Sequence, residues 1–326
     1  MILILSRTDD GSTNRIIDWL VYQKKEYIRL NGNRNNYKLL SIKPDEISVE
    51  IYGKKINLLR SSSFWYRRSA FSERTFNYTS KKDQLKHIFK EEIDQFFINS
   101  QLNNEFRVIF EYLYYLLEDH IPNKVGNYFH RDVNKLIILH EASKAGLQIP
   151  KSYIAHTKDD LLSLKDKKII TKALKDGVYY LKRKYEYFSY TEEIDFTNTV
   201  TERISNEFVP SLLQEKINKK YELRVFYLDK KLYPTVIFSQ QHKSAAVDFR
   251  KSPENIRFLP YNLPEDIREK IGKLMEQLGH KIGAIDLIVD ENDQYIFLEV
   301  NPGGQFSYYS DHCNYYLEKE IAQLLT

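Results

Sequence analysis

Residues 283–306 read GAIDLIVDENDQYIFLEVNPGGQF, and this stretch decides the fold class. Two apolar runs, Ile282–Val289 and Tyr295–Val300, flank the polar turn Asp290–Asp293, which is the pattern of a β-hairpin. The Asn-Pro-Gly-Gly sequence that follows does not suit a strand, so the second run ends there. The chain therefore carries a buried strand pair near its C-terminus.

The hairpin register brings three oxygen-bearing side chains together. If the turn closes symmetrically, Asp286 faces Phe297, and Glu299 lies diagonal to Asp286 on the same face, with Asn301 next along. Buried carboxylates need a compensating cation, and oxygen ligands with open positions suit Mg²⁺ that bridges nucleotide phosphates. The alternative is an edge hairpin whose acids face water, but the apolar residues around Glu299 weigh against it.

Composition limits the classes of protein to which the chain can belong. Its 326 residues are 42% hydrophobic and 29% charged, as in ordinary globular proteins with two or three subdomains. A net charge of +4 is too small to indicate a nucleic-acid surface. The lone Cys313 excludes an internal disulfide and fits the cytoplasm, and the apolar stretch Val108–Leu117 is too short to span a membrane. We expect a soluble cytoplasmic protein.

The pattern along the chain predicts an α/β protein. Residues 1–60 read as a β-α-β layer, and the apolar spacing within 81–120 predicts helix. Breakers at 122–126 separate this first lobe from the rest. Two further helices are predicted at Asp132–Ala145 and Pro264–Leu278, each followed by glycine.

A second group of residues suits a nucleotide. The strand end Gln214–Ile217 can offer backbone groups to adenine, with Glu215 accepting from the amino group. Glu222 follows where a carboxylate could take both ribose hydroxyls, and Arg224 shares its strand face. Taken alone, this Glu-Lys alternation fits an exposed strand at least as well.

Two lysines are candidates for phosphate contacts. Lys172 ends an apolar strand before a turn, a place from which an ammonium can reach phosphates. Lys135 begins a helix, where a cation opposes the helix dipole unless an anion is bound. For either lysine alone, a solvated surface residue is the better interpretation.

The order of these candidate residues along the chain resembles that of the ATP-grasp superfamily, from about residue 125 to the C-terminus. The order is Lys135, Lys172, Glu215 to Glu222, Asp286, Glu299 and Asn301. The resemblance is strongest to ligases that macrocyclise ribosomal peptides, the microviridin-type graspetide synthetases and the grasp-with-spasm maturases. The segments that carry it are NK...EASKAGLQIPKS, QEKI...YELRVFYL, VDFR at Val247–Arg250, FLEVNPGGQF, the opening MILILSRTDDGSTNRIIDWL, and SSFWYRRSAF at Ser62–Phe71. Two patterns are more specific to this group of ligases than the others. They are W-Y-R-R within Ser62–Phe71 and NPxGQ followed by an aromatic residue.

The resemblance implies ATP and Mg²⁺ as cofactors and a role for each candidate residue. The implied contacts are Lys135 and Lys172 with phosphates, Glu215 and Ile217 with adenine, Glu222 with ribose, Asp286, Glu299 and Asn301 with magnesium, Arg250 with the γ-phosphate or acyl phosphate, and Arg224 as its companion. One departure is the segment after Lys172, which has a single glycine and many aromatics where many ATP-grasp enzymes have a glycine-rich flap.

The resemblance also implies three subdomains, with ATP between the last two. They are an N-terminal α/β domain at 1–122, a central ATP-grasp subdomain at 123–207 and a C-terminal one at 208–326. The partner implied is a ribosomally made precursor peptide, with a leader for affinity and a core that is modified. Tyr179–Asp195, rich in aromatics and charges, is the predicted leader surface, although a hairpin packed on its own lobe explains it nearly as well.

The implied reaction activates Asp or Glu side chains of the precursor as acyl phosphates. Ser, Thr or Lys side chains then form ester or amide crosslinks. Two alternatives stay open: a glutamate ligase of the kind that modifies ribosomal proteins, or another amino-acid ligase, and a non-enzymatic nucleotide- or peptide-binding module. No nucleic-acid or membrane partner is expected, and whether the chain forms a homodimer is open.

Overall fold

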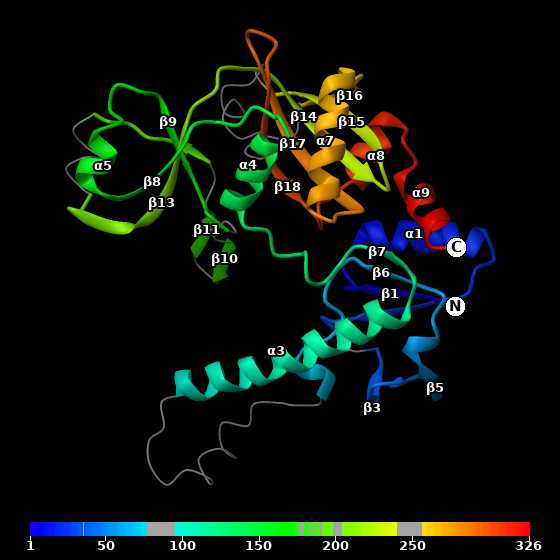
Figure 1. Cartoon of the computed structure of the whole chain (residues 1–326). Helices are drawn as coiled ribbons and strands as arrows, with labels where there is room; N and C mark the ends of the chain where they lie inside the picture. Colours follow the sequence, from blue (N-terminus) through cyan, green and yellow to red (C-terminus); the bar gives the residue numbers. More distant parts are fainter. Residues whose placement is uncertain are drawn as a thin grey trace. The chain divides into compact units, whose positions relative to one another are not determined.

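The computed structural model describes residues 1–34, 36–76, 95–175, 179–182, 185–188, 191–197, 204–239 and 256–326 (Figure 1). Contacts divide the chain into two compact units. Unit 1 comprises Met1–Arg131 together with Tyr316–Thr326, and unit 2 comprises Asp132–Tyr315.

Unit 1 is built on a four-stranded parallel sheet in the order β2-β1-β6-β7. Its strands are β1 (Ile2–Ser6), β2 (Tyr27–Asn31), β6 (Ser63–Tyr66) and β7 (Asn123–Val125). Every residue of β1 is buried, as expected of an inner parallel strand with both faces covered. The β-α-β opening predicted for residues 1–60 is therefore confirmed.

Helices and a small antiparallel sheet complete unit 1. These elements are α1 (Gly11–Tyr22), β3 (Lys38–Lys43), β4 (Glu46–Ile51), β5 (Lys54–Asn57), the 3-10 turns η1 (Leu58–Arg60) and η2 (Glu73–Phe76), α3 (Gln95–His120) and α9 (Leu317–Leu324). Helix α9 packs on α1 although nearly 300 residues separate them in the chain. Residues 77–94, part of the predicted 81–120 helix, lie outside the described residues.

Unit 2 contains a five-stranded antiparallel sheet in the order β16-β15-β14-β17-β18. The strands are β14 (Lys219–Leu228), β15 (Lys231–Phe238), β16 (Arg257–Pro260), β17 (Ile282–Asp290) and β18 (Tyr295–Asn301). Helices α4 (Lys135–Lys144) and α7 (Glu265–Gln277) share one apolar core with this sheet. Alternate residues such as Leu223, Val225 and Ile285 point into that core, so the residues between them face the other side of the sheet.

A second sheet in unit 2 has the order β12-β9-β13-β8. The remaining elements are β8 (Ser152–Thr157), α5 (Lys158–Leu162), β9 (Ile169–Lys172), β10 (Tyr179–Lys182), β11 (Tyr185–Phe188), β12 (Glu192–Glu193), β13 (Glu207–Glu215) and α8 (Ser307–Cys313). Strands β10 and β11 form the hairpin expected as one interpretation of the predicted leader surface. Most side chains of that surface lie outside the described residues.

The predicted register of the β17–β18 hairpin is wrong, because Val289 pairs with Tyr295 and not with Gln294, and a bulge then adds a second shift. Asp286 pairs with Glu299 and not with Phe297, which instead faces Leu287. The extra residue, Leu298, shifts the pairing between these two positions. The bulge places the two carboxylates directly opposite each other, closer than the diagonal arrangement predicted from symmetry.

No helix among the described residues is both long and apolar enough to cross a bilayer.

Candidate active site

A row of three charged side chains crosses the face of the five-stranded sheet opposite α4 and α7. Arg224 on β14 is registered with Asp286 on β17, and Asp286 with Glu299 on β18. Arg224 Nη1 donates to both oxygens of Asp286, at 2.7 and 2.6 Å. Asn301 lies two residues beyond Glu299, and its Nδ2 donates to Glu299 Oε1 at 3.1 Å. Two carboxylates and one carboxamide therefore converge, as the sequence predicted.

Two lysines from other elements lie beside this row. Lys135 begins α4, and its Nζ is 3.7 Å from Glu299 Oε2 and donates to the carbonyl of Ala173 at 3.0 Å. Lys172 ends β9 and lies within electrostatic range of Glu299 and Asp286. The second sheet thus brings a cation to the carboxylates of the first.

The pKa values reflect a crowded and partly desolvated cluster. Burial raises the pKa of Asp286 to about 6, although Arg224 opposes the shift. Burial would also raise the pKa of Glu299, but Lys172 and Lys135 outweigh it and hold this pKa below its usual value. Burial lowers the pKa of the Lys172 ammonium, with Glu299 opposing the shift. Such opposed shifts in one cluster are typical of functional sites.

The turn after β18 is closed by glycine for a steric reason. A Cβ on Gly304 would lie 2.4 Å from the Cβ of Ala284 and 3.1 Å from Arg224 Nη2. The Gly304 amide donates to the Asn301 carbonyl at 3.0 Å. The second glycine of the NPGG sequence therefore lets the turn approach Arg224 closely.

The residues predicted to hold adenine line a separate cavity of about 360 Å³. The cavity is lined by residues 148–151 and 215–218, which connect the two sheets, and by residues 290–292 of the β17–β18 turn. Glu215, Ile217 and Ile296 are among the lining residues. The side chain of Glu215 already has partners, because Tyr153 Oη and Lys167 Nζ donate to its Oε1 at 2.8 and 2.6 Å. In this structure Glu215 would offer adenine its backbone rather than a free carboxylate.

Glu222 is likewise engaged. Lys219 Nζ and Ser239 Oγ donate to its Oε1 at 2.6 and 2.7 Å, and 15% of its side chain is exposed. Its other oxygen and the lone pairs that remain could still accept from ribose. The charge of Glu222 also acts on Asp286, so the two carboxylates belong to one electrostatic cluster.

The structure thus gathers six of the predicted site residues at one place. Glu222 belongs to the same electrostatic cluster, and Glu215 and Ile217 line the separate cavity. Gathered are Arg224, Asp286, Glu299, Asn301, Lys135 and Lys172. Arg250 lies outside the described residues. No local pattern indicated Lys167 or Tyr153 as partners of Glu215. Lys167 stands in a charged run, and only folding brings it to Glu215.

The donors present fit a magnesium–nucleotide complex. Among the described residues no group of three or more His, Cys, Asp or Glu side chains could hold a metal alone. Asp286, Glu299 and Asn301 supply hard oxygen ligands but too few, which leaves positions for phosphate oxygens and water. Arg224 Nε is buried and has no hydrogen-bond partner in the described part of the chain. A buried donor that lacks an acceptor, beside two lysines, is consistent with a site for anionic phosphate.

Solved structures resemble the chain over its whole length. A RiPP-associated ATP-grasp ligase from Chryseobacterium gregarium, in complex with ADP and a leader and core peptide, is 26% identical with a TM-score of 0.78, over 99% of this chain and 94% of that one. The macrocyclase MdnC from Microcystis aeruginosa, bound with the precursor peptide MdnA, is 24% identical with a TM-score of 0.77, over 100% and 99%. The chain has the ATP-grasp fold.

A third similar structure is a complex that contains Mg as well as ADP. The ATP-grasp ligase PsnB, complexed with a phosphomimetic variant of its minimal precursor, Mg and ADP, is 15% identical with a TM-score of 0.73, over 99% of this chain and 97% of that one. No protein-family model and no curated protein matches the sequence. The predicted ATP-grasp fold and the resemblance to graspetide-type ligases are confirmed by these structures.

Proposed function

We propose that this ATP-grasp protein is an ADP-forming ligase that modifies a ribosomally made precursor peptide. It activates Asp or Glu side-chain carboxylates as acyl phosphates and joins them to Ser, Thr or Lys side chains as esters or amides. The observation that carries the proposal is the row Arg224–Asp286–Glu299 with Lys135 and Lys172 beside it. The similar ligases in complex with leader, core or precursor peptides support the class of substrate.

In the first step a peptide carboxylate oxygen attacks the γ-phosphorus of ATP. The bond from that phosphorus to the β–γ bridging oxygen breaks, and ADP leaves. Lys135, Lys172 and Arg224 supply positive charge around the phosphoryl group as it is transferred, which is the main catalytic contribution that a protein makes to such a step. The cations are preorganised, because Glu299 and Asp286 already hold two of them in place.

In the second step the acceptor oxygen or nitrogen attacks the acyl carbon, loses its proton, and inorganic phosphate leaves. Asp286, Glu299 and Asn301 would hold magnesium, which when bound neutralises phosphate charge. Because burial and Glu299 raise the pKa of Asp286, this residue binds a cation best once it is ionised above about pH 6. Glu215, Ile217 and Glu222 would hold the nucleoside.

Mass spectrometry of the product tests the proposal. The purified chain is incubated with ATP, Mg²⁺ and a candidate acidic precursor encoded beside its gene, with Glu299→Gln as the inactive control. We expect ADP release that depends on the peptide and a peptide mass lower by one water for each ring. A glutamate ligase would instead raise the mass of its acceptor, and a binding module would bind nucleotide without any ADP release.

Further details belong to the same proposal. We propose three subdomains at 1–122, 123–207 and 208–326, with ATP between the last two, and a cytoplasmic location. The contact division differs in detail, because it places the boundary after Arg131 and joins Tyr316–Thr326 to the N-terminal unit. Arg250 remains the proposed contact for the γ-phosphate or acyl phosphate.

A further inference from the structure

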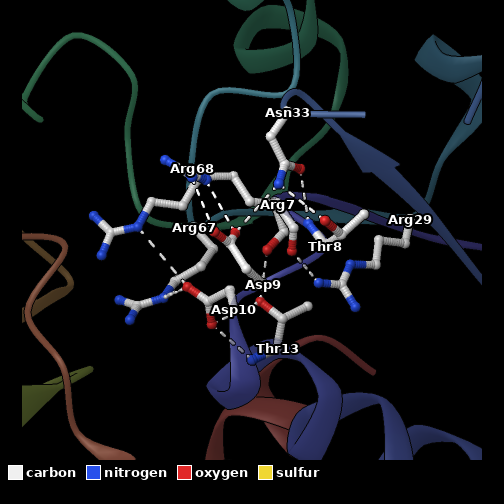
Figure 2. A network of polar contacts seen from close by, with 10 residues as sticks. Arg7, Thr8, Asp9, Asp10, Thr13, Arg29, Asn33, Arg67 and Arg68 are labelled. Carbon is white, nitrogen blue, oxygen red and sulfur yellow. Dashed lines mark hydrogen bonds and ion pairs between the residues drawn. The ribbon is translucent and has the colours of Figure 1, made fainter. Parts of the chain in front are cut away.

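Unit 1 carries a cluster of arginines that the proposed chemistry does not use. Arg7 follows β1, Arg67 and Arg68 follow β6, and the side chain of Arg29 on β2 donates to the carbonyl of Arg7. Arg7, Arg67 and Arg68 lie where β1 and β6 end, and the side chain of Arg29 reaches them from the middle of β2; Figure 2 shows the four gathered around Asp9 and Asp10. The carboxyl edge of an open parallel sheet is where ligands bind in α/β proteins. We call these four residues the arginine edge.

The innermost pair of the cluster is structural. Arg67 Nε donates to Asp10 Oδ2 at 3.1 Å, and the two side chains are 2% and 5% exposed. Asp10 also caps α1, because its Oδ1 accepts from the amide and hydroxyl of Thr13 at 2.9 and 3.2 Å. The charge of Asp10 is therefore already used by Arg67 and by the start of the helix.

Arg68 is the member whose ion pair is longer than that of Arg67 and is shared with it. Its Nε is 3.8 Å from Asp10 Oδ2, the oxygen that Arg67 occupies, and 38% of its side chain is exposed. Within the described residues its guanidinium makes no hydrogen bond. Its nearest acid lies on the Nε side, so the two Nη groups are left as a fork for an incoming acceptor.

The other two arginines add charge without cancelling it. Arg7 is paired with Asp9, with both side chains more than half exposed. Arg29 is held by the carbonyl of Arg7 and by Asn14 Oδ1, neither of which is charged, and its Nε is buried without a partner in the part of the chain described. In the ion pairs found among the described residues of this edge, Asp9 pairs with Arg7, and Asp10 pairs with both Arg67 and Arg68, so these two carboxylates face four guanidinium groups next to the N-terminus of α1.

We propose that the arginine edge binds a side-chain carboxylate of an acidic peptide, with Arg68 as its bidentate partner. The inference rests on the proposed function only in naming that peptide as the precursor. A planar carboxylate matches the guanidinium fork, and its single charge suits a site that already contains Asp9 and Asp10. The W-Y-R-R segment, which the ligase chemistry leaves unexplained, would then serve to bind substrate.

Equilibrium binding of two synthetic peptides to the full chain tests this site. One is a short fluorescent Glu-rich peptide and the other its Gln counterpart, and their affinities are compared for the wild type, Arg68→Gln, Arg68→Lys and the control Arg60→Gln. Arg60 is an exposed arginine of the same unit. We expect Arg68→Gln to weaken the Glu peptide about tenfold or more, Arg68→Lys to weaken it less, and neither to change the Gln peptide.

Three results would overturn the proposal. The first is unchanged binding of the Glu peptide to Arg68→Gln, and the second is an equal loss of affinity for both peptides. The third is displacement of the Glu peptide by inorganic phosphate when chloride of the same ionic strength has no effect, because the site would then be a phosphate site. Because binding needs no turnover, a chain that failed to release ADP would refute the proposed ligase and leave this comparison intact. Thermal melting of each variant separates a lost contact from a lost fold.

Discussion

Glu299→Gln is the most informative single change, because it removes one charge and preserves the shape of the side chain. Glu299 lies opposite Asp286, accepts from Asn301 Nδ2 and pairs with Lys135. It is also the main opponent of the burial that lowers the pKa of Lys172. One substitution therefore removes both a proposed magnesium ligand and the counter-charge of two lysines.

The effect on stability is smaller than the effect on catalysis. The Glu299 and Lys135 charges are 3.7 Å apart, which corresponds to about 4.5 kcal/mol of attraction at an effective dielectric constant of about 20. The cost of partly burying both groups cancels much of this, so we expect the free energy of unfolding to fall by about 1–3 kcal/mol. This is less than the total stability of a typical protein, and the variant should fold.

Catalysis should fall further, because a charge lost from the phosphoryl-transfer site acts on the transition state. We expect ADP release to slow by about 10²- to 10³-fold, as when one preorganised electrostatic contact is removed from an enzyme. The assay is ADP release at saturating ATP, peptide and Mg²⁺, with urea unfolding of the same samples. Glu276→Gln, an exposed carboxylate on α7, is the matched control and should match the wild type. Turnover of Glu299→Gln near the wild-type rate at saturating Mg²⁺ would show that Glu299 holds no metal.

Three further predictions concern the same sheet. Asn301→Ala removes an oxygen ligand and the donor to Glu299 Oε1, so ADP release should fall by at least tenfold in the same assay, and unchanged release would exclude Asn301 as a ligand. Because burial raises the pKa of Asp286 to about 6, its carboxylate takes up a proton below that pH, and the Mg²⁺ concentration for half-maximal ADP release should rise as the pH falls through about 6; a flat profile between about pH 5 and 7 would contradict this. Gly304→Ala places a Cβ 2.4 Å from a β17 side chain and should cost about 1–3 kcal/mol in urea unfolding, whereas Gly272→Ala on α7, with nothing within 4 Å of the new Cβ, should be neutral or stabilising. Equal stability of the two glycine variants would show that the turn has room.

The sequence by itself determined the elements and the chemistry of the hairpin. Alternating apolar residues around a polar turn define β17 and β18 whatever surrounds them, and an acid in such a strand must find a cation. The helices predicted at Asp132–Ala145 and Pro264–Leu278 are found at Lys135–Lys144 and Glu265–Gln277, because apolar spacing and a following glycine are local signals.

Only the tertiary structure decided which charges meet. The bulge at Leu298 set Asp286 against Glu299, and a bulge depends on strain and pairing across strands that no local pattern records. Lys172 comes close to Glu299 and Asp286, and Lys167 contacts Glu215, only because separate segments pack together. From the sequence alone, a solvated surface position is the better interpretation of each lysine. The sequence can name the ionisable groups, whereas their partners and pKa values depend on distances and burial that exist only in the folded chain.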